Sequence, residues 1–417
     1  MQASVSLKIA KLIQDIANFG LETLRKAFFP HTGKTIDRLM NHPGRVLILR
    51  TGNVGDTACA LPALAAVRYN FPLAHLTLLT SPGPRGLPEA REVLERQGLV
   101  DEIITFYRED FADLSFRKNL LRNLRQRRFD LFLLFPQERT DLRRTFRDLL
   151  FARLLGVKGA WGFTLAHHFP FMDNRRLHDY RPPHNEVERL LLLLQRTGIN
   201  SLKRYQIQLP MPCQQMADRL LEPYFQNGSR PVIGLQTRAK AQANQWPLAN
   251  FTELGRRLQA TCQPVFILFG GPAEKDQLQE FAHTFPGDKF IAAGQTSLLE
   301  TTALLSRCHV QVTLDTGPMH LAALVGTPIV ALFSARQFPV MWEPCSDNAV
   351  ILRKSVPCEL CFQEDCDHLT CMKAITVEEV YAAVLDHLRR HNRQLLCNNR
   401  MSSIEPASQY ISQFFLA

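Results

Sequence analysis

The fold is decided by one stretch of the sequence, Val310-Gln311-Val312-Thr313-Leu314-Asp315-Thr316-Gly317-Pro318-Met319-His320-Leu321-Ala322-Ala323-Leu324. The β-branched residues at its start are typical of a buried strand. Gly317 lets the backbone turn without a Cβ clash. Pro318 suits the first position of a helix, where its missing N–H is not needed. The stretch therefore predicts a strand, a tight turn and the start of a helix.

The predicted helix start has the properties of an anion site. Its first backbone N–H groups have no partner within the helix, and the helix dipole favours negative charge there. An ordinary turn between a strand and a helix explains Asp315 and Gly317 equally well. Thr316 and His320 add two side-chain donors at the same place. This combination favours a site for an anion or a nucleotide.

Composition narrows the classes of partner. The chain has 417 residues, 46% of them hydrophobic and 21% charged, which predicts a globular protein of two domains. Its net charge of +10 favours anionic partners such as nucleotide sugars, phosphorylated glycolipids or an anionic membrane face. Nucleic acid is a further anionic candidate, but the sequence contains no signature of a nucleic-acid-binding motif. Charged residues interrupt the N-terminal apolar pattern, so we expect no secretory signal and a cytoplasmic protein.

Residues 4–29 carry apolar side chains at helical spacing, with Lys8, Lys11, Arg25 and Lys26 on the opposite face. Such a helix can lie on an anionic membrane surface or pack on its own domain. Both interpretations are open from the sequence. Residues 30–43, with two prolines and a glycine, are typical of a linker.

The first clear strand, Arg45 to Arg50, leads into a glycine-containing loop and then a helix. Gly52 and Gly55 permit a ligand to approach the backbone closely. Asp56 stands at the helix start, at the end of the strand where open α/β sheets bind ligands. Its carboxylate can cap the helix or accept a proton from a sugar hydroxyl. From the loop alone we favour the cap.

Strands alternate with helices along the whole chain, which predicts parallel, doubly wound sheets. The pattern loosens between residues 203 and 230 and then begins again. We therefore expect an α/β protein with two Rossmann-like domains facing across a cleft. The predicted segments are an amphipathic extension and linker (1–43), a first domain (44–225), a second domain (226–375), a C-terminal helix (376–396) and a tail (397–417).

Two further clusters have more than one interpretation. A basic stretch is either a solvated helix face or a surface for phosphorylated acceptors; it contains Arg139, Arg143, Arg144, Arg147 and Arg153. Near the C-terminus, four cysteines could bind zinc or an iron–sulfur cluster, although their spacing fits neither standard pattern. These are Cys358, Cys361, Cys366 and Cys371, and whether they bind a metal is open.

Two runs of residues resemble the ADP-heptose:lipopolysaccharide heptosyltransferase family, glycosyltransferase family 9. The first extends from Arg45 through Gly55-Asp56 to Leu64, and the second from Asp315 to Pro328. The Trp246-Pro247 pair, the loop from Gly270 to Glu274 and the cysteine segment also resemble members. The similarity covers roughly residues 44 to 390.

The resemblance implies a GT-B fold, with the acceptor in the first domain and the nucleotide sugar mainly in the second. It implies inverting transfer from ADP-heptose to a lipopolysaccharide-core glycolipid at the inner membrane face, with no metal or other cofactor. Asp56 matches the family's general base, and Glu274 is placed to bind the ribose. Thr316, Gly317, Met319 and His320 fall where the family holds the diphosphate. The rest of the implied donor site is Thr51, Gly52, Gly55, Lys240, Trp246 and Asp315.

One position departs from the family pattern. Members commonly carry a lysine two positions before the Trp-Pro pair, where it contacts the phosphates, and this chain has Asn244. Either Lys240 reaches in from the loop, or the leaving group is stabilised less. The departure leaves two other functions open: a related transferase with another nucleotide sugar or acceptor, and a non-catalytic module that binds nucleotides or glycans.

Overall fold

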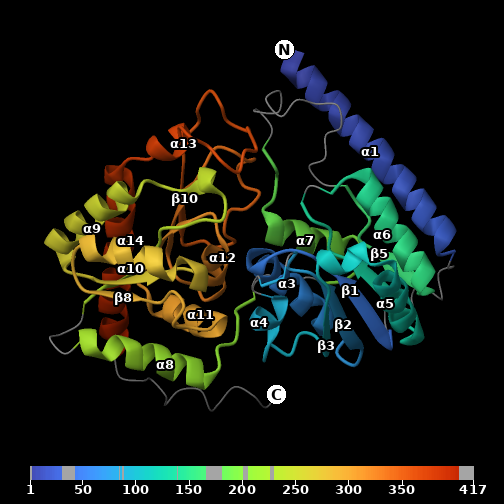
Figure 1. Cartoon of the computed structure of the whole chain (residues 1–417), viewed down its shortest axis with the longest axis horizontal. Helices are drawn as coiled ribbons and strands as arrows, with labels where there is room; N and C mark the ends of the chain where they lie inside the picture. The colour runs from blue at the N-terminus through green and yellow to red at the C-terminus, as the bar shows by residue number, and fades with distance from the viewer. Residues whose placement is uncertain are drawn as a thin grey trace, which may run out of the picture.

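The computed structural model describes residues 2–30, 43–83, 85–86, 89–138, 140–165, 181–200, 205–225 and 230–402. Most of the predicted linker and the predicted tail beyond Ser402 lie outside these residues, and so does Arg139. The chain forms two α/β halves that lie side by side (Figure 1). The prediction of two Rossmann-like halves is confirmed.

The first half contains a parallel sheet of order β3-β2-β1-β4-β5. Its central strands are buried because helices cover both faces, which explains their mainly apolar sequences. The strands are β1 (Arg45–Leu49), β2 (His75–Thr80), β3 (Glu102–Thr105), β4 (Leu131–Leu134) and β5 (Gly159–Trp161). The helices are α3 (Val54–Asn70), α4 (Ala90–Leu94), α5 (Leu114–Gln126), α6 (Leu142–Leu155) and α7 (Glu186–Gln195).

The second half contains a parallel sheet of order β11-β10-β9-β6-β7-β8. Its strands are β6 (Val232–Gln236), β7 (Val265–Phe269), β8 (Lys289–Ile291), β9 (Val310–Leu314), β10 (Ile329–Phe333) and β11 (Ala349–Arg353). Its helices are α8 (Met211–Leu221), α9 (Leu248–Cys262), α10 (Lys275–Thr284), α11 (Leu298–Arg307), α12 (Gly317–Leu324), α13 (Thr370–Lys373) and α14 (Val377–Ser402). Short 3-10 helices occupy Glu109–Ala112, Glu222–Tyr224, Gln242–Asn244 and Pro272–Glu274.

The boundaries differ from the sequence predictions at a few places. β5, β8 and β11 are edge strands that were not predicted. β5 and β8 have three residues each, which is too short to show a period. The C-terminal helix continues past residue 396 to Ser402. The division at residues 225 and 226 remains a proposal, and α8, which precedes it, packs on α11 of the second half.

The two halves share a hydrophobic core where α3 packs against α12. Leu61 and Leu64 of α3 belong to the same buried cluster as Met319 and Leu321 of α12. A second cluster fills the space between the second sheet and α9 and α14. The shared core fixes the beginnings of α3 and α12 relative to each other, and the site lies there.

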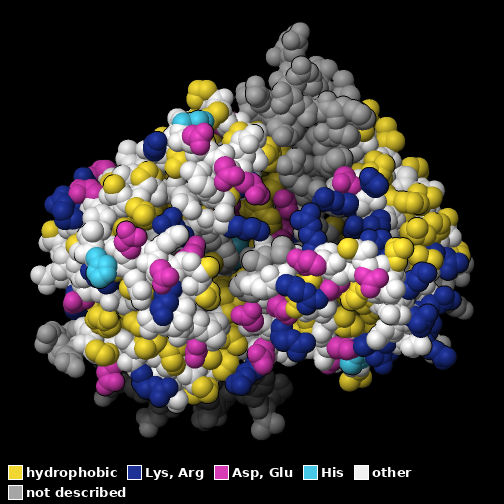
Figure 2. All heavy atoms as spheres, viewed as in Figure 1, with side chains coloured by type: hydrophobic (Ala, Val, Ile, Leu, Met, Phe, Trp, Pro, Cys, Tyr) yellow, Lys and Arg dark blue, Asp and Glu magenta, His cyan; other side chains and the backbone are white. Residues whose placement is uncertain are grey.

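The N-terminal helix α1 (Gln2–Phe28) packs on the first half, against α6 and the edge strand β5. Asn18 Oδ1 accepts a hydrogen bond from the Leu165 backbone N–H at 2.7 Å, and Leu21 is buried. One side of α1 thus packs on its own domain, as one of the two interpretations predicted. Hydrophobic and basic side chains remain exposed along the edge formed by α1 and α6 (Figure 2). No helix among the described residues is both long and apolar enough to cross a membrane.

Candidate active site

The starts of α3 and α12 approach each other across the two halves of the protein. A Cβ atom on Gly55 would lie 3.4 Å from the Gly317 Cα atom and 3.4 Å from His320 Cδ2. Gly317 is the first residue of α12 and does not have a positive φ. The predicted strand, turn and helix start are confirmed, but the turn does not need the backbone freedom of a glycine at position 317. A Cβ atom on Gly317 would lie 3.4 Å from the Gly55 backbone nitrogen, which is ordinary van der Waals contact. Pro318 is accordingly the second helical residue rather than the first.

Asp56 lies in the first turn of α3 and caps it. Its Oδ2 accepts a hydrogen bond from the Asn53 backbone N–H at 2.9 Å, and its Oδ1 lies 3.1 Å from Arg50 Nη2. Gly52 has φ of 140°, and a Cβ atom there would lie 2.2 Å from Asp56 Cγ. Only glycine therefore fits beside this carboxylate. The N-cap of α3 is Asn53 rather than Asp56, and Asp56 caps the helix from its third position by accepting from the Asn53 N–H. This contact leaves the proton-accepting role compatible with the geometry.

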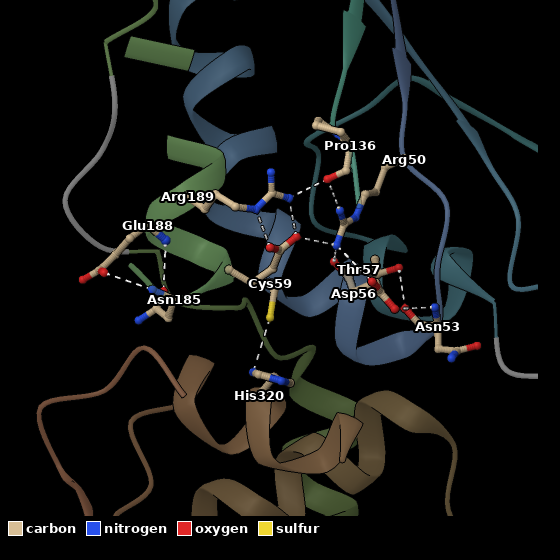
Figure 3. A network of polar contacts seen from close by, with 11 residues as sticks. Arg50, Asn53, Asp56, Thr57, Cys59, Pro136, Asn185, Glu188, Arg189 and His320 are labelled. Atoms are coloured by element: carbon tan, nitrogen blue, oxygen red, sulfur yellow. Dashed lines mark hydrogen bonds and ion pairs between the residues drawn. The ribbon is translucent and has the colours of Figure 1, made fainter. Parts of the chain in front are cut away.

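A buried ion-pair network extends from Asp56 into the first half (Figure 3). Arg50 Nη2 lies 3.0 Å from Glu186 Oε1, and Arg50 Nη1 donates to the Pro136 carbonyl oxygen at 3.1 Å. Arg189 Nε lies 2.7 Å from Glu186 Oε2 and its Nη2 donates to the same carbonyl. Arg50 thus has three partners, because Asp56 and Glu186 share its Nη2 and the Pro136 carbonyl oxygen accepts from its Nη1.

Arg50, Glu186 and Arg189 were not predicted from the sequence as site residues. One signal was present: Arg50 is a charged residue directly after a buried apolar strand, and a buried charge requires partners. The partners could not be found from the sequence, since Glu186 lies more than a hundred residues away.

Burial and neighbouring charges shift the acidities in this network. Burial raises the pKa of Asp56, and the Arg50 charge opposes that rise. Burial also works against ionisation of Glu186, but Arg189 and Arg50 hold its pKa below the ordinary value. Burial and the charges of Glu186 and Asp56 raise the pKa of Glu138 to about 7. Three carboxyl groups thus share two guanidinium groups, and Glu138 is the one whose ionisation is opposed most.

On the side of the second half, His320 of α12 reaches α3. Its Nδ1 lies 3.3 Å from Cys59 Sγ (Figure 3). Burial lowers the pKa of His320 to about 4, so the imidazole is neutral at neutral pH. Burial also raises the pKa of the Cys59 thiol well above its ordinary value. His320 therefore offers one N–H donor, and no positive charge, at the start of α12.

Met319 and Thr316 were also predicted to contact the diphosphate. The Met319 side chain is buried in the shared core, so a diphosphate would meet only its backbone. Thr316 is the N-cap, and its hydroxyl donates to the Leu314 carbonyl oxygen at 3.3 Å.

Asp315 and Asn244 belong to a polar cluster at the carboxyl end of the second sheet. Asn244 Nδ2 donates to Asp315 Oδ2 at 3.3 Å, and the Ser334 hydroxyl donates to Asn244 Oδ1 at 2.6 Å. Burial raises the pKa of Asp315 to about 6, while the Arg336 charge opposes the rise. Arg336 is 8% exposed, and its Nε is buried without a hydrogen-bond partner. Lys240, by contrast, is exposed. Arg336 was not predicted from the sequence, because nothing in its local sequence indicates a residue of the donor site.

The remaining predicted donor residues lie in structural positions. Trp246 is buried, and its Nε1 donates to the Ile375 carbonyl oxygen at 2.9 Å, which ties its loop to the C-terminal segment. Glu274 Oε2 accepts from the Gly271 N–H at 2.8 Å and so caps its own turn. Thr51 is half-buried beside Gly52. Contacts of these residues with a donor stay predictions.

The cysteine segment shows thiols rather than disulfides. All four predicted cysteines are free, and Cys366 Sγ lies 3.6 Å from His368 Nε2. Within the described residues, no group of three or more His, Cys, Asp or Glu side chains is arranged to hold a metal ion.

The sequence of the chain is similar to those of known proteins. Over 131 residues the chain is 34% identical to lipooligosaccharide heptosyltransferase 2 of Haemophilus influenzae, covering 30% of this chain and 37% of that protein. It is 24% identical to lipopolysaccharide heptosyltransferase 2 of Escherichia coli K12 over 74% of this chain and 88% of that protein.

Solved structures show the same fold. A family 9 glycosyltransferase from Veillonella parvula superposes with a TM-score of 0.66 at 19% identity, covering 83% of this chain and 98% of that one. The E. coli ADP-heptose lipopolysaccharide heptosyltransferase II gives a TM-score of 0.60 at 21% identity, covering 84% and 99%. The family model of glycosyltransferase family 9 matches residues 117–371, which is more than half of the chain. The chain therefore belongs to glycosyltransferase family 9, the heptosyltransferases.

Proposed function

We propose that this protein transfers a heptose from ADP-heptose to a lipopolysaccharide-core glycolipid with inversion at the anomeric carbon, in the cytoplasm at the inner membrane face. Family membership and the named relatives support the sugar and the class of acceptor. The observation that carries the proposal is the position of Asp56. Its carboxylate is held by Arg50 at the start of α3, and the start of α12 lies directly opposite.

In the proposed reaction, Asp56 accepts the proton of an acceptor hydroxyl. The hydroxyl oxygen forms a bond to the anomeric carbon from the face opposite the diphosphate. The bond between that carbon and the diphosphate oxygen breaks, and its electron pair leaves with ADP. Arg50 and Gly52 are positioning residues, because they fix where the Asp56 carboxylate stands. The raised pKa of Asp56 makes it a stronger base than an exposed aspartate.

The leaving diphosphate would be stabilised at the start of α12. Backbone N–H groups from Gly317 onward and the His320 imidazole would provide donors there, and donors placed where charge develops dominate such catalysis. The Thr316 hydroxyl would add a further donor only by giving up its bond to the Leu314 carbonyl oxygen. Arg336 would provide positive charge beside Asp315, a task that the sequence analysis gave to Lys240. This positive charge is why we propose a reaction without a metal ion. Glu274 would bind the ribose, while Thr51, Gly52, Gly55 and Trp246 would form or support the donor site.

A second candidate is a related transferase that uses another nucleotide sugar or acceptor. The specific observation in its favour is Asn244, which is buried and bonded to Asp315 and Ser334 where family members commonly place a lysine. A site in which this position is neutral could prefer a donor with a different phosphate contact.

The test is acceptor-dependent ADP release from ADP-heptose, with a Kdo-lipid A-type acceptor and a heptosylated core acceptor. Asp56→Ala should reduce turnover by about two to four orders of magnitude. The matched control is Asp113→Ala, since Asp113 also caps a helix, through Ser115, but on α5. ADP binding without release would favour another sugar or acceptor. Neither release nor binding would favour a non-catalytic module.

A further inference from the structure

A second functional surface lies on the outer edge of the first half, where α1 and α6 pack together. α1 leaves Leu12, Ile16 and Phe19 exposed, with Phe19 76% exposed. α6 exposes a row at every fourth position, which places them on one face; these are Leu142, Phe146, Leu150 and Leu154. Single exposed apolar residues are ordinary, but contiguous rows on neighbouring helices mark an interaction surface.

An open groove lies between the two helices, beside the α1 row and at the start of the α6 row. The groove has a volume of about 560 Å³ and is lined by Gly20 and Leu24 of α1 and by Leu142, Arg143 and Phe146 of α6. A shallow apolar groove beside a guanidinium group suits an acyl chain whose anionic headgroup stays at the surface.

Basic side chains of α6 flank the apolar row. Arg144 is 57% exposed and Arg147 is 69% exposed, while Asp148, the partner of Arg147, turns inward and is 14% exposed. Arg153 of α6 and Lys8 of α1 are also exposed. The exposed carboxylates are fewer: Asp15 and Glu22 on α1, with Glu22 paired to Arg25 and Lys26, and Asp141, which pairs with Arg144. Figure 2 shows yellow and dark-blue side chains along this edge.

We propose that the α1–α6 surface, meaning the exposed apolar rows with their flanking basic residues, docks the protein on a bilayer of anionic phospholipids. An apolar face bordered by Arg and Lys is the pattern of a helix that lies in the plane of such a surface. A second copy of this chain fits less well, because a symmetric contact through α6 would set the basic row against itself. α1, with 27 residues, gives the surface a length of about 40 Å.

The test is flotation of the full chain with vesicles of phosphatidylethanolamine and phosphatidylglycerol, compared with vesicles of phosphatidylcholine alone. We expect binding to the anionic vesicles that weakens as salt is added. The double variant Phe19→Ser/Phe146→Ser should lose about tenfold or more in partitioning. Arg143→Gln/Arg147→Gln should lose about fivefold per residue.

The matched control is Tyr69→Ser/Leu73→Ser, which removes two side chains that are 66% and 97% exposed elsewhere on the first half. It should bind as the unmodified chain does, and circular dichroism should show all variants folded. Equal binding by all variants, or none by the unmodified chain, would overturn the proposal. So would self-association that the Phe19→Ser/Phe146→Ser variant abolishes, since the occupant would then be a second copy. Flotation needs no substrate, so its outcome is independent of the proposed reaction.

Discussion

Arg50 Nη2 lies 3.1 Å from Asp56 Oδ1, and the same nitrogen lies 3.0 Å from Glu186 Oε1. One buried guanidinium group therefore holds the proposed base and a second carboxylate together. Arg50 opposes the rise in the pKa of Asp56, whereas Glu186 adds to it. The two neighbours should have opposite effects on the pH dependence of the reaction.

Arg50→Lys should lower kcat by about tenfold and shift its acidic limb to higher pH. Lysine has a single nitrogen, so it cannot contact the two carboxylates and the Pro136 carbonyl as the two Arg50 nitrogens do, and Asp56 loses stabilisation of its ionised form. Glu186→Gln should shift the same limb to lower pH. The measurement is kcat against pH for both variants. Arg68→Lys is the control, because Arg68 pairs with Asp101 away from the site. Parallel shifts in Arg50→Lys and Glu186→Gln would show that the pair does not tune Asp56.

Gly52→Ala should remove most activity. The new Cβ atom would lie 2.2 Å from Asp56 Cγ at a φ of 140°, so the carboxylate must move. Gly83→Ala separates backbone strain from this clash, since Gly83 has φ of 96° but no atom within 4 Å of the added Cβ. Both variants should lose about 1–2 kcal/mol of unfolding free energy. Only Gly52→Ala should lose activity. Comparable losses of activity in the two variants would refute a specific role for Gly52.

Glu138 should make the protein less stable as pH rises. Its pKa in the folded protein is about 7, above the ordinary 4.5. The folded state thus binds the proton more tightly than the unfolded state does. The resulting contribution to the unfolding free energy is fully present below about pH 4.5 and is lost as pH rises through about 7. The difference in unfolding free energy between Glu138→Gln and the unmodified chain should therefore change with pH. From acidic pH to about pH 8 it should shift in favour of the variant by on the order of 2 kcal/mol. Urea unfolding at several pH values measures this, and a constant difference across pH would contradict the expectation.

Arg336 and Lys240 provide a matched pair of cations for donor binding. Arg336→Met should weaken ADP binding by about tenfold, because a buried charge is screened less than an exposed one. Lys240→Met should change the Kd by about twofold or less, since Lys240 is exposed. Calorimetric titration with ADP gives both values. A larger effect at Lys240 would restore the interpretation that its side chain reaches into the site.

The fold could be predicted from the sequence because its central strands are buried on both faces. The sequences of β1 and β7 are apolar from Val46 to Leu49 and from Val265 to Phe269, and those of β2 and β9 are mainly apolar. All four end in polar or glycine-containing loops. The edge strands β5 and β8 carry no comparable signal, since three residues show no period. The position of Asp56 at the start of α3 followed from its loop, but its partners did not. Arg50 and Glu186 meet only because α7 packs on α3.

Gly317 shows a limit of the same kind. A glycine before a proline suggests a turn that requires glycine, but the turn before α12 forms without a positive φ at Gly317. Asn244 likewise appeared as a lost cation in the sequence. Its contacts with Asp315 and Ser334 are visible only once β9 and β10 lie side by side.

The decisive measurement is kcat for Asp56→Asn together with its Kd for ADP. Asparagine keeps the size of Asp56 and an oxygen that can accept the Asn53 N–H, so the cap of α3 persists. It cannot accept a proton at neutral pH. If Asp56 is the base, kcat falls by about two to four orders of magnitude while the Kd for ADP changes little. A kcat within about tenfold of the unmodified chain, with α3 intact, would show that Asp56 only caps its helix.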